Sequence, residues 1–168
     1  MTDRPDPAIA GFNALDAATA EQRLLRCLDV PRWASEVAQA RPYADLDDLR
    51  DRAGRAAATL TDDELDAALA GHPRIGERAG AGHDKAFSAS EQSGVDAADG
   101  DVTTALHEGN LAYEKRFDRV FLIRAAGRDS AQILAELRRR LDNDDASERA
   151  EVVTQLREIA LLRLEQVV

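Results

Sequence analysis

The sequence is short of cysteine, of long apolar runs and of basic charge. Its 168 residues include one cysteine, which excludes an intrachain disulfide and is typical of a reducing compartment. No apolar run approaches the roughly 20 residues that a membrane-spanning helix needs. The 22 lysine and arginine residues are outnumbered by 32 acidic residues, so the formal net charge is -10. Because such a charge repels a phosphate backbone, nucleic acid is not an expected partner.

Targeting signals are missing as well. The stretch Met1–Pro7 is polar and lacks the basic and apolar blocks of a signal peptide, and residues 166–168 carry no Ser-Lys-Leu type address. We therefore expect a soluble, cytoplasmic protein with no membrane contact and with residues 1–8 as a flexible tail. An anionic small substrate would have to be attracted locally, by an arginine or by helix N-termini.

The apolar residues recur at helical spacing almost everywhere, and strand-like alternation is nearly absent. The pattern predicts an all-α fold, with residues 1–168 forming a single compact domain of about eight helices. Capping chemistry marks four of the helix starts, at Asp45, at Thr61 with Glu64, at Ser130 and at Ser147. The expected helices span about 15–29, 31–40, 46–60, 62–70, 89–97, 102–119, 131–141 and 148–167.

The stretch from Gly71 to Glu77 holds a histidine between glycine and proline, in a break between two predicted helices. Pro73 biases His72 toward extended backbone, and the glycine before it tolerates unusual dihedral angles, so the imidazole sits on a turn of defined shape. Histidine also titrates nearest to neutral pH. His72 is thus a candidate acid–base group, and the alternative is a plain turn between helices.

A second motif, Ser88-Ala89-Ser90-Glu91-Gln92, fits a capping box in which Ser88 and Glu91 satisfy backbone groups at a helix start. A cap alone explains it. The same helix start also offers amides to a carboxylate or carbonyl oxygen, and Gln92 is able to read an amide-like group. The structural and the ligand-binding interpretation are compatible.

Arg163 falls in the middle of the apolar face that Val152, Leu156, Ile159 and Val167 form on the last predicted helix. A buried guanidinium requires an internal carboxylate or an anionic ligand. The alternative is a side chain whose apolar stem is covered while its charged head reaches water.

On the helix predicted to begin near Val102, Asn110 and Tyr113 face the core, where each is expected to make a buried hydrogen bond. After this helix the run from Val120 to Gly127 is β-branched and aromatic, which predicts extended backbone with amides open to a ligand. Cys27 lies in an apolar pattern and is expected to be a core thiol.

Other chemistries lack their motifs. The three histidines are 11 and 24 residues apart, and no metal-ligand spacing, phosphate-binding glycine loop or nucleophile elbow is present. Neither a metal nor a cofactor is expected.

Taken together, these motifs resemble the OHCU decarboxylases (2-oxo-4-hydroxy-4-carboxy-5-ureidoimidazoline decarboxylases), which form allantoin in urate degradation. The resemblance covers nearly the whole chain, and its most specific elements are His-Pro-x-Ile-Gly and Ser-x-x-Glu-Gln. It rests on Phe12-Asn13, Cys27, Trp33, Arg41-Pro42-Tyr43, Gly71–Gly76, Ser88 with Glu91-Gln92, Asn110, Tyr113, Phe117, Phe121–Arg128, Arg140-Leu141, Asn143, Glu158-Ile159 and Arg163-Leu164.

The resemblance implies a cofactor-free, metal-free, all-helical and usually dimeric enzyme that makes (S)-allantoin. It implies that His72 is the proton donor, that Glu91 orients it or holds substrate, and that Arg163 supplies a counter-charge. The remaining substrate-binding positions that it implies are Pro73, Ser88, Ala89, Ser90, Gln92, Ile123, Arg124, Ala125, Ala126 and Gly127.

One departure from the family pattern concerns the backbone. Residues 117–120 are Phe-Asp-Arg-Val, where many members have Phe-Gly-Phe. Two other functions are conceivable from the residues alone: a cofactor-free hydrolase or tautomerase that acts on a related ureide, and a helical binding module in which His72 only shapes a turn.

Overall fold

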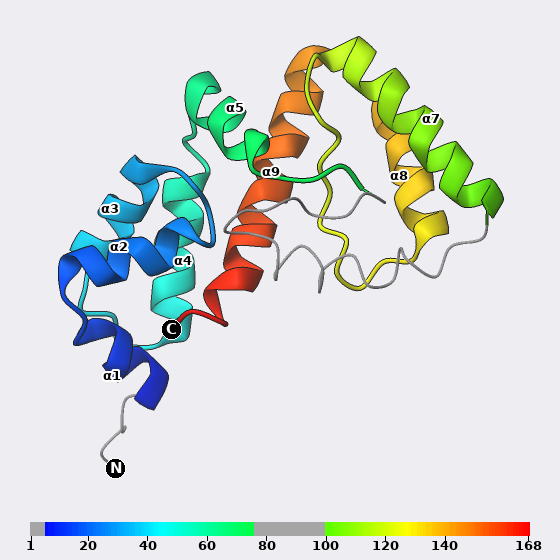
Figure 1. The fold of residues 1–168 in the computed structure, drawn as a ribbon. Helices are drawn as coiled ribbons and strands as arrows, with labels where there is room; N and C mark the ends of the chain where they lie inside the picture. Colours follow the sequence, from blue (N-terminus) through cyan, green and yellow to red (C-terminus); the bar gives the residue numbers. More distant parts are fainter. Residues whose placement is uncertain (1–5, 76–99) are drawn as a thin grey trace. The chain divides into compact units, whose positions relative to one another are not determined.

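Helices are the only regular secondary structure in residues 6–75 and 100–168, the parts that this computed structural model describes. The all-α prediction is confirmed. None of the described helices is long and apolar enough to cross a bilayer. The helices, labelled in Figure 1, are α1 (Pro7–Asn13), α2 (Ala17–Leu25), α3 (Pro31–Gln39), α4 (Leu46–Ala57), α5 (Asp62–Ala70), α7 (Gly100–Phe117), α8 (Ser130–Leu141) and α9 (Asp145–Leu164).

The chain divides into two compact units. The first comprises Met1–Ala68 with Arg157–Val168, and the second comprises Leu69–Leu156, so the division falls within α5 and within α9. In the first unit α3 packs against α2 and α4, and the buried indole of Trp33 donates a hydrogen bond to the carbonyl of Ala53 at 2.9 Å. Cys27 is 1% exposed, which confirms that it is a core thiol.

In the second unit α7 and α8 lie side by side (Figure 1). Gly109 permits this close approach, because a Cβ atom there would lie 2.5 Å from Cδ2 of Leu137. Both helices contribute side chains to an apolar core, which comprises Ile75, Leu106, Tyr113, Phe117, Phe121, Ile123, Ala125, Ile133, Leu134 and Leu137.

Two of the predicted caps are confirmed. Asp45 accepts from the N–H of Asp48 at 2.8 Å, and Thr61 and Glu64 form the reciprocal bonds of a capping box. The predictions at Ser130 and Ser147 are wrong: Asp129 caps α8 in a box with Gln132, and the N–H of Ser147 donates to Asp144. In both places an aspartate just upstream accepts the hydrogen bond from the backbone N–H, because a full negative charge is stabilised at the positive end of the helix dipole.

The N-terminal region contains one more helix than the spacing predicts. No helix was expected before Leu15, yet α1 begins at Pro7, where Asp6 accepts from the N–H of Ala8 at 3.0 Å and proline occupies the first turn. Pro7 and Ala8, assigned to a tail, are thus helical. The helix expected over 89–97 lies outside the described residues.

Candidate active site

His72 lies in a short turn that follows α5. The helix ends at Ala70, and the backbone N–H of His72 donates to the carbonyl of Leu69 at 3.0 Å. His72 and Pro73 are half-buried, whereas Ile75 is 5% exposed and belongs to the core of the second unit. The predicted turn is present, and its imidazole is neither a core side chain nor fully exposed.

Two side chains of α7 hold the residues that follow Pro73. The Asn110 amide donates to the carbonyl of Ile75 at 3.1 Å, which confirms its predicted buried hydrogen bond. The Arg74 guanidinium donates twice to the carboxylate of Glu114, and Nη2 lies 2.9 Å from Oε2. The hydrogen bond from Arg74 holds the pKa of Glu114 below its usual range. α7 thereby fixes the backbone directly after the histidine.

The predicted run leaves helical geometry as expected, since no residue from 118 to 129 is helical. Ile123 and Ala125 are 3% and 5% exposed and share one core with Ile75. The fold therefore brings the end of the His72 turn and the predicted substrate-binding run onto the same apolar cluster. Gly127 ends the run with a φ of 79°, a conformation that glycine adopts without steric cost.

The departure at Phe117-Asp118 has a structural consequence. Asp118 has a φ of 54° directly after α7 ends, so it adopts the left-handed conformation that glycine favours. Aspartate tolerates this region better than most residues do. The chain leaves the helix here although it lacks the glycine that many members of the resembled family carry.

Side chains hold the extended run in place. The carbonyl of Leu122 accepts from Nη1 of Arg140 at 2.7 Å, and the N–H of Arg124 donates to Oε1 of Gln155 at 2.8 Å. Such bonds replace the ladder that a neighbouring strand would supply, and the described residues contain no strand.

A buried ionic network lies next to this run. Arg140 and Glu148 are each 1% exposed, and Nε of Arg140 lies 2.9 Å from Oε1 of Glu148. Tyr113 donates its hydroxyl to the same carboxylate, and the Asn143 amide donates to Oε2 at 3.0 Å. Burial, reinforced by the bond to Glu148, raises the pKa of the Tyr113 phenol, so the hydroxyl remains a donor. The predicted buried hydrogen bond of Tyr113 is confirmed.

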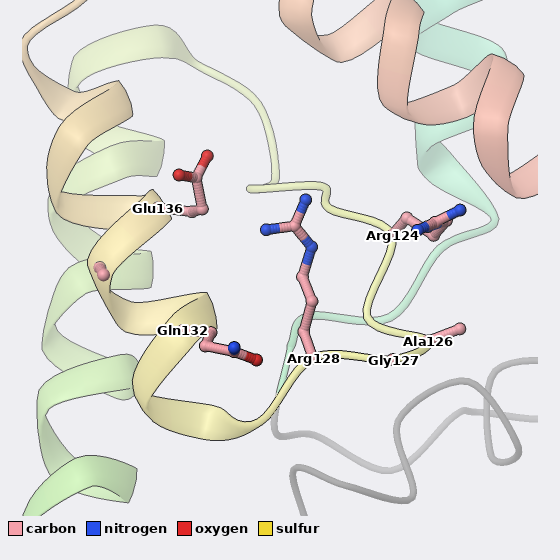
Figure 2. A pocket seen from close by; sticks show the side chains of 7 residues that line it. Arg124, Ala126, Gly127, Arg128, Gln132 and Glu136 are labelled. Atoms are coloured by element: carbon pink, nitrogen blue, oxygen red, sulfur yellow. The ribbon is translucent and has the colours of Figure 1, made fainter.

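An open cavity of about 440 Å³ lies between the run and α8 (Figure 2). Three predicted substrate-binding residues, Arg124, Ala126 and Gly127, line it. In Figure 2 the Arg128 guanidinium extends into the space between the run and α8. At the far wall Arg139 binds Glu136 and holds the pKa of that carboxyl below its usual range. The other lining residues are Arg128, Gln132, Ala135 and Glu136.

Arg163 belongs to the first unit, where it is 1% exposed. The alternative in which its head reaches water is wrong, since the residue is almost completely buried. Ser88, Ala89, Ser90, Glu91 and Gln92 lie outside the described residues. Within 6–75 and 100–168 no three histidine, cysteine or carboxylate side chains are grouped as a metal would require.

Sequence reasoning gave no role to Arg140, Glu148 and Gln155, although Arg140 is part of the family resemblance. A signal for the first two exists. Arg140 lies three residues after buried Leu137, and Glu148 lies four before buried Val152, so each falls on an apolar face as Arg163 does. Two opposite charges on the buried faces of consecutive helices predict an internal pair. No comparable signal marks Gln155.

Comparison with known proteins decides which family this arrangement represents. The family model described as OHCU decarboxylase matches residues 13–165. The chain belongs to the OHCU decarboxylase family. Membership makes it a carboxy-lyase, and it confirms the resemblance drawn from the His-Pro and Ser-x-x-Glu-Gln motifs.

Individual relatives agree with this assignment. A protein of Amia calva named 2-oxo-4-hydroxy-4-carboxy-5-ureidoimidazoline decarboxylase is 27% identical over 141 residues, which are 82% of this chain and 81% of that protein. A crystal structure of OHCU decarboxylase in the presence of (S)-allantoin is similar in fold, with a TM-score of 0.74, 23% identity, and coverage of 87% of this chain and 96% of the other. A crystal structure of (S)-allantoin synthase has a TM-score of 0.71 and 14% identity; the match covers 95% of this chain and 54% of that one.

Proposed function

We propose that this protein converts OHCU to (S)-allantoin without a cofactor, and that His72 is its acid–base group. The observation that carries the proposal is the placement of the His72 turn and the run Ile123–Gly127 on one core, in a chain of the OHCU decarboxylase family. The turn then offers a titratable imidazole, and the run Ile123–Gly127 offers backbone donors and acceptors.

The substrate itself makes metal-free chemistry feasible. One ring carbon carries both a hydroxyl and a carboxylate, and the adjacent ring carbon, which bears the ureido group, forms a C=N bond. When the bond to the carboxylate breaks, CO2 leaves and the electron pair forms a C=C bond, while the imine pair moves to nitrogen and takes a proton. A proton then adds to the carbon that bears the ureido group, and the enol becomes the ring carbonyl. The imine is the electron sink, so the protein has to orient the substrate and deliver one proton to one face.

In this proposal His72 delivers that proton from its turn. Asn110 binds the carbonyl of Ile75, and Glu114 binds the side chain of Arg74. Because these bonds fix the backbone after Pro73, they restrict the position of the imidazole. Ile123–Gly127 contact the ring through their backbone, and Pro73 packs beside it. By resemblance to the family, Arg163 supplies the counter-charge to the substrate. Glu91, with Ser88, Ala89, Ser90 and Gln92, completes the site by resemblance to the family.

His72→Asn tests the assignment. The variant keeps a polar side chain of similar size and removes the titratable group, so we expect the rate above the spontaneous reaction to fall by about 10²–10⁴-fold. Circular dichroism would follow the allantoin formed from urate by uricase and the hydrolase that acts next, with this protein added. Accumulation of (S)-allantoin at the wild-type rate in His72→Asn would refute the role of the histidine.

Release of CO2 from freshly generated OHCU above the spontaneous rate separates this function from a hydrolase or tautomerase. A binding module would show no rate above the spontaneous one, and His72→Ala would change only its stability.

We also propose that the protein acts as a cytoplasmic homodimer whose residues 1–168 form one functional domain. The support is the usually dimeric family and the single, buried cysteine. Light scattering coupled to gel filtration measures the mass, and a monomer at micromolar concentration would contradict the dimer.

A further inference from the structure

The extended run that follows α7 is held by side chains at alternate backbone groups. The Arg140 guanidinium donates a hydrogen bond to the carbonyl of Leu122, and the side-chain oxygen of Gln155 accepts one from the N–H of Arg124. Ile123 and Ala125 place their side chains in the core, so the run is fixed from within as well. Backbone of this kind has few other restraints, because the described residues supply no partner strand.

The same arrangement leaves other backbone groups available. Within the described part of the chain, no group pairs with the backbone N–H of Ile123 or of Ala125. Buried backbone donors are almost always satisfied, so amides without a partner among the described residues are suited to a ligand's oxygen atoms. Gln155 holds the amide that lies between these two.

We propose that Gln155, assisted by Arg140, is a positioning residue for the decarboxylation: it sets the backbone from Ile123 to Ala126 so that the neighbouring amides face the substrate. This inference rests on the proposed function. Gln155 does not touch the reacting atoms; it acts through Arg124 N–H, which it binds at 2.8 Å.

The chemistry makes such placement matter. The amides have to hold the ring while one face receives a proton, and a displacement of about 1 Å at a catalytic site costs on the order of a hundredfold in rate. Gln155 is half-buried and carries no charge, whereas Arg140 is one half of a buried ion pair. A change at Gln155 therefore tests positioning with less damage to folding than a change at Arg140.

The decisive comparison is Gln155→Leu against Gln155→Glu. Leucine removes the acceptor and keeps a similar volume, while glutamate keeps an oxygen at the same reach. We expect Gln155→Leu to lower kcat on the order of tenfold or more with little change in KM, and to lower the enantiomeric excess of the allantoin formed. Gln155→Glu should retain kcat within about threefold. Thr154→Ala is the matched control, since the Thr154 hydroxyl is exposed and bonds only within its own helix, to Ala150.

Amide hydrogen exchange gives a second readout that does not depend on activity. The N–H of Arg124 should exchange faster in Gln155→Leu than in the wild type, with the amides of α3 unchanged. Wild-type kcat and enantiomeric excess in Gln155→Leu, or an equal loss in Gln155→Glu, would overturn the proposal. If Gln155→Leu does not fold, Gln155→Asn replaces it, because its side chain is one methylene too short to reach; wild-type kcat in that variant has the same meaning.

Failure of the proposed function is recognised separately. In that case the wild-type protein itself gives no CO2 above the spontaneous rate. The exchange of Arg124 then decides whether Gln155 holds the run, and unchanged protection in Gln155→Leu rejects it.

Discussion

The second compact unit contains a buried ion pair that contrasts with the exposed pairs of the first. In the first unit Arg32 binds Glu36 and Glu64 with 40% of its side chain exposed, and Arg50 pairs with Glu165 at similar exposure. In the second unit the arginine of the pairs Arg74–Glu114 and Arg139–Glu151 is also exposed, but Arg140 and Glu148 pair with 1% exposure on each side. The buried pair adjoins the one long irregular run among the described residues, whose carbonyl at Leu122 it also binds. Regular helices satisfy their own backbone, whereas an irregular run inside a core needs polar side chains to do so.

The largest effect is expected from breaking the buried pair. Arg140→Met leaves the Glu148 carboxylate buried without its main partner, which should lower the free energy of unfolding by about 3–5 kcal/mol. Urea denaturation followed by circular dichroism measures it. The double variant Arg140→Met with Glu148→Leu removes both charges and should recover part of the loss. A loss below about 1 kcal/mol in Arg140→Met would remove the contrast between the units.

A smaller effect is expected at the edge of the same network. Tyr113→Phe deletes the hydroxyl that donates to Glu148 and keeps the ring in the core, so it should cost about 1–3 kcal/mol. Tyr43→Phe is the counterpart in the first unit, because its buried hydroxyl donates to the neutral carbonyl of Val37 at 2.6 Å. The loss at Tyr113 should be the larger of the two in parallel urea titrations, since its acceptor is charged.

Asp118→Gly should stabilise the second unit. The φ of 54° costs a residue with a side chain up to about 1 kcal/mol, and glycine adopts this conformation freely. The thermal midpoint should therefore rise. Asp118→Ala is the control, because it keeps the strain and loses the side chain; a midpoint for glycine no higher than that of alanine would contradict the backbone argument.

The exposed pair of the first unit should matter least at neutral pH. Arg32→Ala removes the ion pairs with Glu36 and Glu64 and a hydrogen bond to the carbonyl of Thr59, and it should cost no more than about 1 kcal/mol, with the difference shrinking in 1 M salt. A loss as large as that of Arg140→Met would show that exposure does not explain the contrast.

Acid titration sharpens the comparison at the rim of the network. The hydrogen bond from Arg139 lowers the pKa of Glu151 from 4.5 to about 2. Because the folded-state value is depressed, the stabilisation is complete above pH 4.5 and is lost as the pH falls toward 2. Glu151→Gln should therefore unfold with a weaker pH dependence between pH 4.5 and 2 than the wild type. Identical slopes for the two proteins would exclude this contribution.

Much of the fold follows from local rules. Asp45, and Thr61 with Glu64, mark helix starts because their side chains bond to amides three residues away. The same rules misplaced the starts at Ser130 and Ser147, where an aspartate upstream competes for the same amides. The kind of bond at a helix start is predictable from the sequence. Which side chain accepts it depends on which of two nearby acceptors binds the amide better.

The candidate site was predictable in part. The His72 turn follows from Gly71 and Pro73. The apolar face around Arg163 left open whether its charged head is buried or reaches water, and the structure shows that it is buried. The bond between Asn110 and Ile75 and the one between Gln155 and Arg124 have no local signal, since the partners are 35 and 31 residues apart.

By itself the sequence determined the all-helical class, the turn that carries His72 and the run that leaves helical geometry before Gly127, because periodicity, proline and glycine act on the neighbouring backbone. The tertiary structure decided what holds them. Only the packing of α7, α8 and α9 brings these side chains within hydrogen-bond distance of their backbone partners: Asn110 of Ile75, Arg140 of Leu122 and Gln155 of Arg124. Such contacts depend on how helices meet, and that is set by the whole core together.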